Sequence, residues 1–204
     1  MLEVRELAAR RGDTPLFEAL SFRVTPGQAL IVTGANGTGK TTLLRSLAGL
    51  SEPHAGDVRL NGEVVAPNSP QLRQQMLFIG HLPALKDELS AEENLASLVT
   101  LAGSSPAADD VREALAAVAL DAQRTLPARV LSQGQRRRVG LARLSLLRRA
   151  LWLLDEPATA LDTAGLAYLA AIMRKHLSTG GAVVAATHQP LDVSVHNAQS
   201  LVLA

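Results

Sequence analysis

A glycine-rich segment followed by a lysine and a threonine constrains this chain more than any other part of its sequence. Residues 34–41 read GANGTGKT, which fits the pattern G-x-x-x-x-G-K-[ST] at every fixed position. The apolar run ALIVT precedes it at 29–33, and leucines follow at Leu43, Leu44 and Leu47, as in an amphipathic helix. A strand, a glycine turn and a helix in this order place backbone N–H groups and a helix N-terminus around a phosphate. The sequence therefore predicts an α/β protein that binds a nucleotide.

The side chains of this loop are expected to have separate roles. Lys40 is predicted to place its ammonium group between the β- and γ-phosphates, and the Thr41 hydroxyl is predicted to bind Mg²⁺. The alternative is a glycine-rich turn with an exposed lysine, which the flanking strand and helix disfavour. The residues predicted to bind ATP here are Gly34, Ala35, Asn36, Gly37, Thr38, Gly39, Lys40, Thr41 and Thr42.

A second buried strand is predicted to end in two adjacent carboxylates. The apolar run Leu151–Leu154 is followed by Asp155 and Glu156. Because successive strand residues point to opposite faces, the two carboxylates can have different roles. Asp155 is predicted to hold Mg²⁺ through its water shell, and Glu156 to accept a proton from the attacking water. Adjacent acids after a strand can also be helix caps or solvated side chains, and the phosphate loop is what favours the catalytic interpretation.

The composition excludes several other classes of protein. The chain has 204 residues, 47% of them hydrophobic, with 20 Lys and Arg against 19 Asp and Glu. This near-neutral balance argues against a general nucleic-acid coat. The absence of cysteine excludes thiolate catalysis and Cys-ligated metal sites. We expect no secretory signal at Met1–Asp13, and no apolar run reaches the roughly 18 residues of a membrane span.

Short apolar runs and helical patterns predict how the chain is organised. Strands are expected at Ala29–Thr33, Val58–Leu60, Met76–Ile79, Leu151–Leu154, Ala182–Ala186 and Ser200–Leu203. Helices are expected at Thr41–Leu50, Ala91–Leu101, Asp109–Leu120, Gln135–Leu147 and Ala164–Leu177. Turn-rich segments cover Ala66–Gln71 and Gly103–Ala108. Because the block from about 85 to 148 shows helical patterns only, it is a candidate subdomain.

A third motif lies at a predicted loop-to-helix junction, where residues 131–138 read LSQGQRRR. Ser132 and Gly134 would offer a hydroxyl and backbone N–H groups to an anion at the start of a helix. An ordinary N-cap serine in front of a basic helix would have the same pattern. Arginines crowd residues 124–149 without interleaved aromatic residues, which favours a solvated helix face that also pairs with acids or nucleotide over a nucleic-acid patch.

The order of these motifs resembles that of the ATP-binding subunits of ABC transporters. The phosphate loop is followed by LSQGQ at 131–135, LLDEP at 153–157, ALD at 160–162 and a strand ending at His188. The resemblance covers residues 1–204. More narrowly, the sequence is similar to the ATP-binding subunits of cytochrome c maturation (haem exporter) complexes. That similarity is carried by FIGH at 78–81, LSAEENL at 89–95, LSQGQRRR at 131–138, WLLDEP at 152–157 and THQP at 187–190.

The resemblance implies one P-loop NTPase domain of the ABC ATPase type over residues 1–204. Residues 1–84 and 149–204 would form the α/β nucleotide-binding core, with a mixed, mainly parallel sheet and an N-terminal antiparallel β portion. Residues 85–148 would form a helical subdomain that carries the signature motif. The implied activity is Mg²⁺-dependent ATP hydrolysis that drives an integral membrane transporter subunit from the cytoplasmic face of the cell inner membrane. Haem-handling maturation proteins are further implied partners, and no nucleic acid is expected.

ABC ATPases act as head-to-tail pairs, with ATP held between the phosphate loop of one chain and the signature motif of the other. By this resemblance, the residues that would contact the nucleotide of a second copy are Ser132, Gln133, Gly134 and Gln135. His188 would sense the γ-phosphate and orient the water and Glu156. Asp162 would link the two sites across the interface.

Two positions depart from the family pattern. Leu82 stands where most relatives carry a glutamine that touches Mg²⁺ and the water, and His81 beside it is a candidate donor in its place. Arginines stand where an aromatic residue usually stacks on adenine. A guanidinium plane can stack on a base, and Arg11 is the predicted contact, with Arg10 as the alternative.

Two other functions stay open at this stage. A soluble ABC ATPase that acts on DNA or ribosomes usually carries coiled-coil insertions or tandem domains, for which 204 residues leave no room. A nucleotide-gated structural clamp with weak hydrolysis is the other, and Leu82 is the residue that suggests it.

Overall fold

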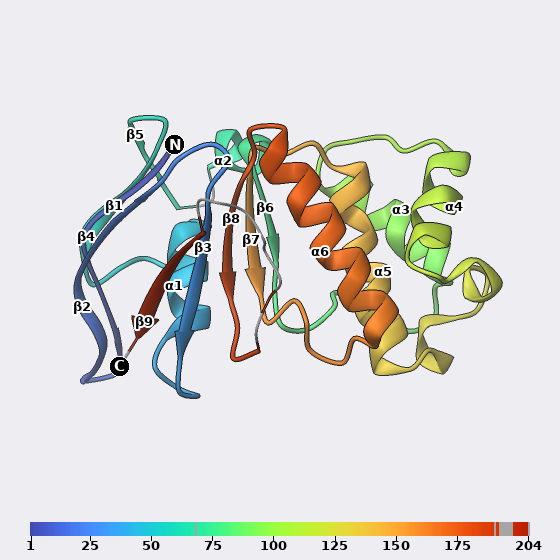
Figure 1. Ribbon diagram of the computed structural model, residues 1–204, viewed down its shortest axis with the longest axis horizontal. Helices are drawn as coiled ribbons and strands as arrows, with labels where there is room; N and C mark the ends of the chain where they lie inside the picture. The colour runs from blue at the N-terminus through green and yellow to red at the C-terminus, as the bar shows by residue number, and fades with distance from the viewer. Residues whose placement is uncertain (68, 190, 192–197, 204) are drawn as a thin grey trace. The chain divides into compact units, whose positions relative to one another are not determined.

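The computed structural model describes residues 1–67, 69–189, 191 and 198–203, and the chain divides into two compact units (Figure 1). Unit 1 comprises Met1–Phe78, Arg149–Glu156 and Met173–Ala204. Unit 2 comprises Ile79–Arg148 and Pro157–Ile172. No helix among the described residues is both long enough and apolar enough to cross a membrane.

Unit 1 contains a four-stranded antiparallel sheet in the order β2-β1-β4-β5. Its strands are β1 (Leu2–Arg11), β2 (Thr14–Val24), β4 (Ala55–Leu60) and β5 (Glu63–Val64). β1 and β2 form a hairpin whose register runs from Leu2 opposite Val24 to Arg11 opposite Thr14, with irregularities between Val4 and Arg10. The predicted N-terminal antiparallel β portion is confirmed.

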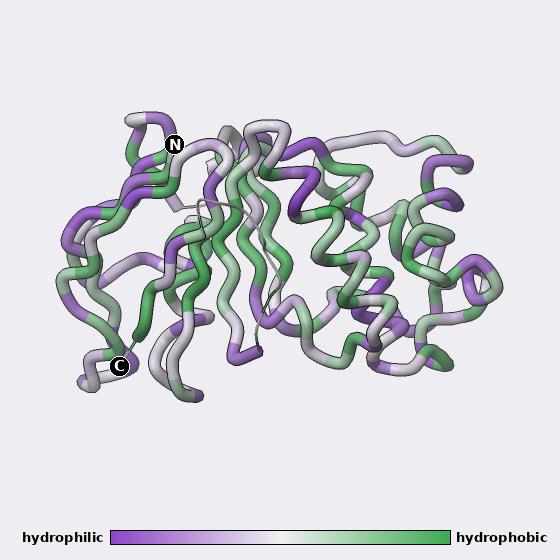
Figure 2. The backbone as a smooth tube through the Cα atoms, viewed as in Figure 1, coloured by the Kyte–Doolittle hydropathy of each residue, from purple (hydrophilic) through white to green (hydrophobic). Residues whose placement is uncertain are grey.

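The central sheet has five strands in the order β6-β7-β8-β3-β9. Its strands are β3 (Ala29–Gly34), β6 (Met76–Ile79), β7 (Leu151–Asp155), β8 (Ala182–Ala186) and β9 (Ala198–Leu203). β3 pairs in parallel with β8 and β9, and β7 pairs in parallel with β8. Every residue of β7 and β8 is buried, which explains why LWLLD and AVVAA do not alternate between apolar and polar residues. Figure 2 shows these strands as largely hydrophobic, and the predicted parallel core sheet is confirmed.

The helix after β3 buries its apolar face in the core of unit 1. α1 (Lys40–Leu47) places Leu43, Leu44 and Leu47 fully inside the core. It ends three residues before the predicted Leu50, because Gly49 turns the backbone to a positive φ of 65°. The predicted turn-rich segment Ala66–Gln71 runs into a helix missed from the sequence, α2 (Pro70–Gln75), which begins with a proline at its first position.

Unit 2 is built from helices. They are α3 (Ala91–Leu101), α4 (Ala108–Ala117) and α5 (Gln133–Leu146), with 3₁₀ turns at Asp121–Gln123 and Ala128–Val130. α5 packs against α3 and α4, and each of the three helices carries a buried leucine: Leu95, Leu115 and Leu141. α4 ends before the predicted Leu120, since Ala119 takes a left-handed φ of 56°. α6 (Thr163–Ser178) has its first ten residues in unit 2 and its last six in unit 1.

The start of α3 is fixed by a reciprocal pair of hydrogen bonds. The Ser90 hydroxyl accepts from the Glu93 N–H at 3.2 Å, and the Ser90 N–H donates to the Glu93 carboxylate at 2.7 Å. These bonds from Ser90 lower the pKa of the Glu93 carboxyl below its ordinary value. The same device recurs at the start of α5, where the signature motif lies.

Candidate functional site

The phosphate loop lies between β3 and α1 in unit 1. The predicted residues Gly34–Thr42 form one continuous stretch from the end of β3 into the first turn of α1. Gly39 has a φ of 98°, and a Cβ at this position would lie 3.0 Å from Leu16 Cβ and 3.1 Å from Phe17. Only a glycine combines this backbone angle with so close an approach of β2.

Lys40 is held inside the loop by backbone oxygens. Its Nζ donates to the Gly34 carbonyl at 2.7 Å and to the Ala35 carbonyl at 3.0 Å, and the residue is 8% exposed. This anchoring brings a positive charge to the loop and contradicts the alternative of a turn with an exposed lysine. Phosphate oxygens would meet the same ammonium group and the N–H groups at the start of α1.

Thr41 and Asp155 meet although 114 residues separate them. The Thr41 hydroxyl donates to Asp155 Oδ2 at 2.9 Å, and Asp155 is 1% exposed at the end of β7. Mg²⁺ prefers oxygen ligands and often takes only one or two carboxylates, with phosphates and water completing its shell. This pair fits that ion, and the described residues contain no cluster of three or more His, Asp or Glu that would hold a metal by themselves.

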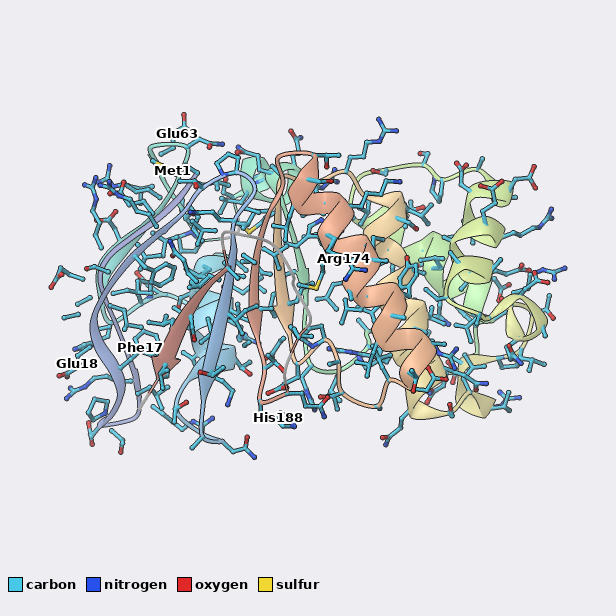
Figure 3. The ribbon with its side chains drawn as sticks, in the orientation of Figure 1. Met1, Phe17, Glu18, Glu63, Arg174 and His188 are labelled. Carbon is cyan, nitrogen blue, oxygen red and sulfur yellow. The ribbon has the colours of Figure 1, made fainter. Side chains whose placement is uncertain are left out.

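Glu156 and His188 are in contact at the same end of the central sheet. His188 Nδ1 lies 2.9 Å from Glu156 Oε2, and Figure 3 labels His188 beyond the end of β8. Glu156 has a left-handed φ of 47°, which is unusual for a residue with a side chain, and its N–H donates to the Ala186 carbonyl at 2.8 Å. Strained backbone of this kind persists where surrounding structure holds it, which is common at functional sites. The two residues predicted to be catalytic are thus in contact.

The signature residues form the first turn of α5, in unit 2. The Ser132 hydroxyl accepts from the Gln135 N–H at 3.2 Å, and the Ser132 N–H donates to the Gln135 side chain at 2.8 Å. A Cβ on Gly134 would lie 2.5 Å from the Ala160 carbonyl oxygen, so a glycine is needed for this approach. One helix N-terminus thus carries Ser132, Gln133, Gly134 and Gln135. The position of Ser132 is compatible with a role as N-cap and with a role in anion binding.

Two arginines after the signature pair with acidic residues, as the sequence predicts. Arg136 Nη1 lies 2.6 Å from Asp87 Oδ1. Arg138 lies 3.7 Å from Asp162 Oδ2 and donates to the Val118 carbonyl at 3.2 Å. Asp162 also accepts from the Gly165 N–H at 2.9 Å, which caps the start of α6.

Arg137 departs from the expected solvated face. It is 4% exposed, and its Nη1 donates to the Gly80 carbonyl at 2.8 Å and to the His81 carbonyl at 2.9 Å. Sequence reasoning missed this contact, because the spacing of 56 residues between Arg137 and His81 carries no signal.

The two departures from the family pattern lie at exposed positions. Leu82 is 79% exposed. It borders a cavity of about 370 Å³ in unit 2, whose other lining residues are His81, Pro83, Gln133, Arg136, Arg137, Thr159 and Ala160. Arg10 and Arg11 are exposed at the tip of the β1–β2 hairpin. Phe17, which lies a few residues further along the chain and is labelled in Figure 3, approaches Gly39 of the phosphate loop.

A stacked ring pair in unit 1, between the buried Trp152 and the half-buried His176, was also missed from the sequence. The rings of Trp152 and His176 are stacked with centroids 3.7 Å apart and planes 3° from parallel. Burial lowers the pKa of His176 below its ordinary value of 6.5. No role was predicted for His54, His176 or His196, and His196 lies outside the described residues.

Comparisons with known proteins agree with this geometry. Residues 17–159 match the protein family described as ABC transporter. The cytochrome c biogenesis ATP-binding export protein CcmA of Aromatoleum aromaticum is 48% identical over 96% of this chain and 92% of its own length. The protein of the same name from Nitrosomonas europaea is 46% identical, over 100% of this chain and 95% of its own length. A solved structure of a putative ABC transporter ATP-binding protein from Pyrococcus furiosus has a TM-score of 0.84 at 25% identity and covers 99% of this chain and 96% of that one. The chain therefore belongs to the ABC transporter family and, within it, to the cytochrome c biogenesis ATP-binding export proteins.

Proposed function

We propose that this chain is the ATP-hydrolysing subunit of a membrane ABC exporter that serves cytochrome c biogenesis. The observation that carries the proposal is the convergence, within unit 1, of the loop around Lys40, the Thr41–Asp155 pair and the Glu156–His188 pair. Phosphoryl transfer depends on positioning and on charge stabilisation, and these groups supply both. The names of the relatives favour export over a soluble ATPase that acts on DNA or ribosomes.

The residues of unit 1 would divide the reaction as follows. Lys40 and the loop N–H groups would bind the phosphates, and Arg11 would stack on the adenine. Thr41 and Asp155 would hold Mg²⁺, whose charge offsets that of the triphosphate when bound. Glu156 would accept a proton from the attacking water. His188 would orient Glu156 through Nδ1, which leaves Nε2 to face the nucleotide.

A second copy of the chain would complete the site. The exposed N-terminus of α5, with Ser132, Gln133, Gly134 and Gln135, would bind the nucleotide held by the phosphate loop of the other copy. Asp162 would couple the two sites from its position at the start of α6. Hydrolysis would then require closure of the pair, which makes it conditional on an assembled site.

We place the domain boundaries where the resemblance puts them, with a nucleotide-binding core at 1–84 and 149–204 and a helical subdomain at 85–148 in one domain of 1–204. The proposed partner is an integral membrane subunit, with the chain bound peripherally at the cytoplasmic face of the inner membrane. Haem-handling maturation proteins are the proposed further partners. Nucleic acid is not a proposed partner.

The test is ATP turnover measured with and without the membrane subunits that copurify with the chain from membranes. We expect turnover that depends on Mg²⁺ and rises with the membrane partner. The alternative of a nucleotide-gated clamp is favoured by one observation, the exposed Leu82 in place of a polar side chain. ATP binding without turnover in either preparation would support the clamp and contradict our proposal.

A further inference from the structure

A buried guanidinium group connects the signature helix to the turn that follows β6. Arg137 lies on α5 and is 4% exposed, with Nη1 bonded to the carbonyls of Gly80 and His81 at 2.8 and 2.9 Å. Burial of a charged group is costly unless hydrogen bonds compensate it. A single nitrogen that holds two consecutive carbonyls fixes the orientation of both peptide planes, and so fixes the course of the turn.

The two ends of this contact belong to functionally distinct parts of the chain. Gly80 directly follows β6, and β6 is the neighbour of β7, the strand that ends in Asp155. Arg137 lies five residues after Ser132 on the same helix, about 7 Å along its axis. Arg137 is therefore close to the proposed contact with the partner's nucleotide at one end and to the exit of a core strand at the other.

Among the described residues, the side chains that neighbour this turn and Arg137 make no such hydrogen bond to the turn. Leu82, the next residue, is 79% exposed. The flanking Arg136 and Arg138 contact other segments, at Asp87 and at Asp162. Among the three arginines of the signature helix, the described contacts thus assign the Gly80–His81 turn to Arg137.

We propose that Arg137 is a positioning residue for ATP hydrolysis, which keeps the Gly80–His81 turn in register with the signature helix. This inference rests on the proposed function. When the N-terminus of α5 engages nucleotide on a second copy, the guanidinium transmits the position of that helix to the turn that leaves β6. Loss of the contact slows hydrolysis but leaves ATP binding by the phosphate loop intact.

The experiment compares Arg137→Met and Arg137→Lys with wild type in the full chain bound to its membrane partner. Methionine keeps much of the side-chain volume but has no donor, whereas the lysine ammonium can donate to both carbonyls. We expect kcat to fall about 10- to 100-fold in Arg137→Met, as loss of alignment can cause, with KM for ATP within about twofold of wild type. Arg137→Lys should recover most of kcat. Arg129→Met removes an exposed arginine of the same unit as a matched control and should leave kcat unchanged.

The possible outcomes separate this inference from the proposed function. Absence of turnover in the wild-type complex would remove both. An active wild type with unchanged kcat in Arg137→Met would overturn the inference alone. A purely structural role would lower the unfolding midpoint and kcat together, with no recovery in Arg137→Lys, and would also overturn it. If Arg137→Met does not fold, Arg137→Leu replaces it, because leucine also has no hydrogen-bond donor; a kcat equal to that of wild type would then contradict the inference.

Discussion

The phosphate loop and the start of the signature helix both present backbone N–H groups at a helix N-terminus, but they are held in different ways. The loop is closed by its own chain, since Lys40 bonds to the Gly34 and Ala35 carbonyls five or six residues away. The signature turn is capped locally by Ser132 and Gln135, whereas the helix behind it is fixed by arginines that reach distant segments. Local contacts thus hold the phosphate loop, and long-range contacts of arginines hold the signature helix.

This difference suggests separate roles for the two regions in nucleotide binding and in hydrolysis. A loop that is shaped locally can bind the phosphates within one copy, whereas a helix end tied to several segments can report that a second copy has engaged. Variants of the two regions should therefore separate nucleotide binding from hydrolysis.

The largest expected effect is that of Glu156→Gln, which leaves the phosphate loop and the signature turn intact but removes the proposed base. We expect kcat to fall at least about 100-fold, the usual contribution of a general base, while ATP binding persists and a closed dimer accumulates. Size-exclusion chromatography with and without ATP measures the dimer, and Glu18→Gln on exposed β2 is the control. A Glu156→Gln protein that stays monomeric with ATP would contradict the proposed pairing.

Lys40→Ala acts on the phosphate loop alone and should have the next largest effect. Loss of a charged hydrogen-bond donor should weaken ATP binding by about 10- to 100-fold, because such bonds contribute roughly 1.5–3 kcal/mol. Isothermal calorimetry with ATP gives the affinity. Lys175→Ala, which removes an exposed lysine of the same unit, should bind ATP as wild type does. Equal affinities in the two variants would refute the role of Lys40.

Gly134→Ala acts on the signature turn. Unlike Lys40→Ala, which weakens ATP binding, it should lower kcat and leave ATP binding unchanged. The added Cβ would lie 2.5 Å from the Ala160 carbonyl, so the first turn of α5 must shift. We expect kcat to fall about tenfold through this misplacement, with ATP affinity unchanged.

Gly140→Ala is the matched control on the same helix, because a Cβ there meets nothing within 4 Å. It should keep kcat and raise the free energy of unfolding by about 0.5–1 kcal/mol, the usual gain of Ala over Gly in a helix. Similar kinetics for the two alanine variants would show that the approach of Gly134 to Ala160 does not matter for hydrolysis.

The smallest effect concerns the scaffold of unit 1 and its pH dependence. Burial lowers the pKa of His176 below its ordinary value of 6.5. As the pH falls below 6.5, His176 therefore binds a proton in the unfolded chain before it does so in the folded chain. The free energy of unfolding should therefore decrease below about pH 6.5 and be insensitive to this residue above it. Thermal unfolding of His176→Phe, which keeps a ring beside Trp152, should show a weaker decline with acid. His54→Gln, at an exposed position, should follow wild type.

The regions that could be predicted from the sequence are those whose physics is local. The glycine pattern of Gly34–Thr41 predicts the turn that this segment forms. The unbroken apolar run of β7 predicts a buried strand that ends at Asp155. The start of α2 was missed because prolines and polar residues also mark turns. The burial of Arg137 and the stacking of Trp152 on His176 could not be predicted, since both depend on which segments the fold brings together.

The hydrogen bond between Thr41 and Asp155 also bears on how the protein is synthesised. The two residues are 114 positions apart, so the glycine-rich loop leaves the ribosome long before the carboxylate that meets its threonine. A contact of such high sequence separation requires closure of a long loop, which slows folding. A nascent chain that stops before β7 would carry the glycine-rich phosphate loop and still lack Asp155, one of the two residues proposed to hold Mg²⁺. Truncated translation products should therefore be unable to sequester magnesium–ATP in the manner of the finished subunit.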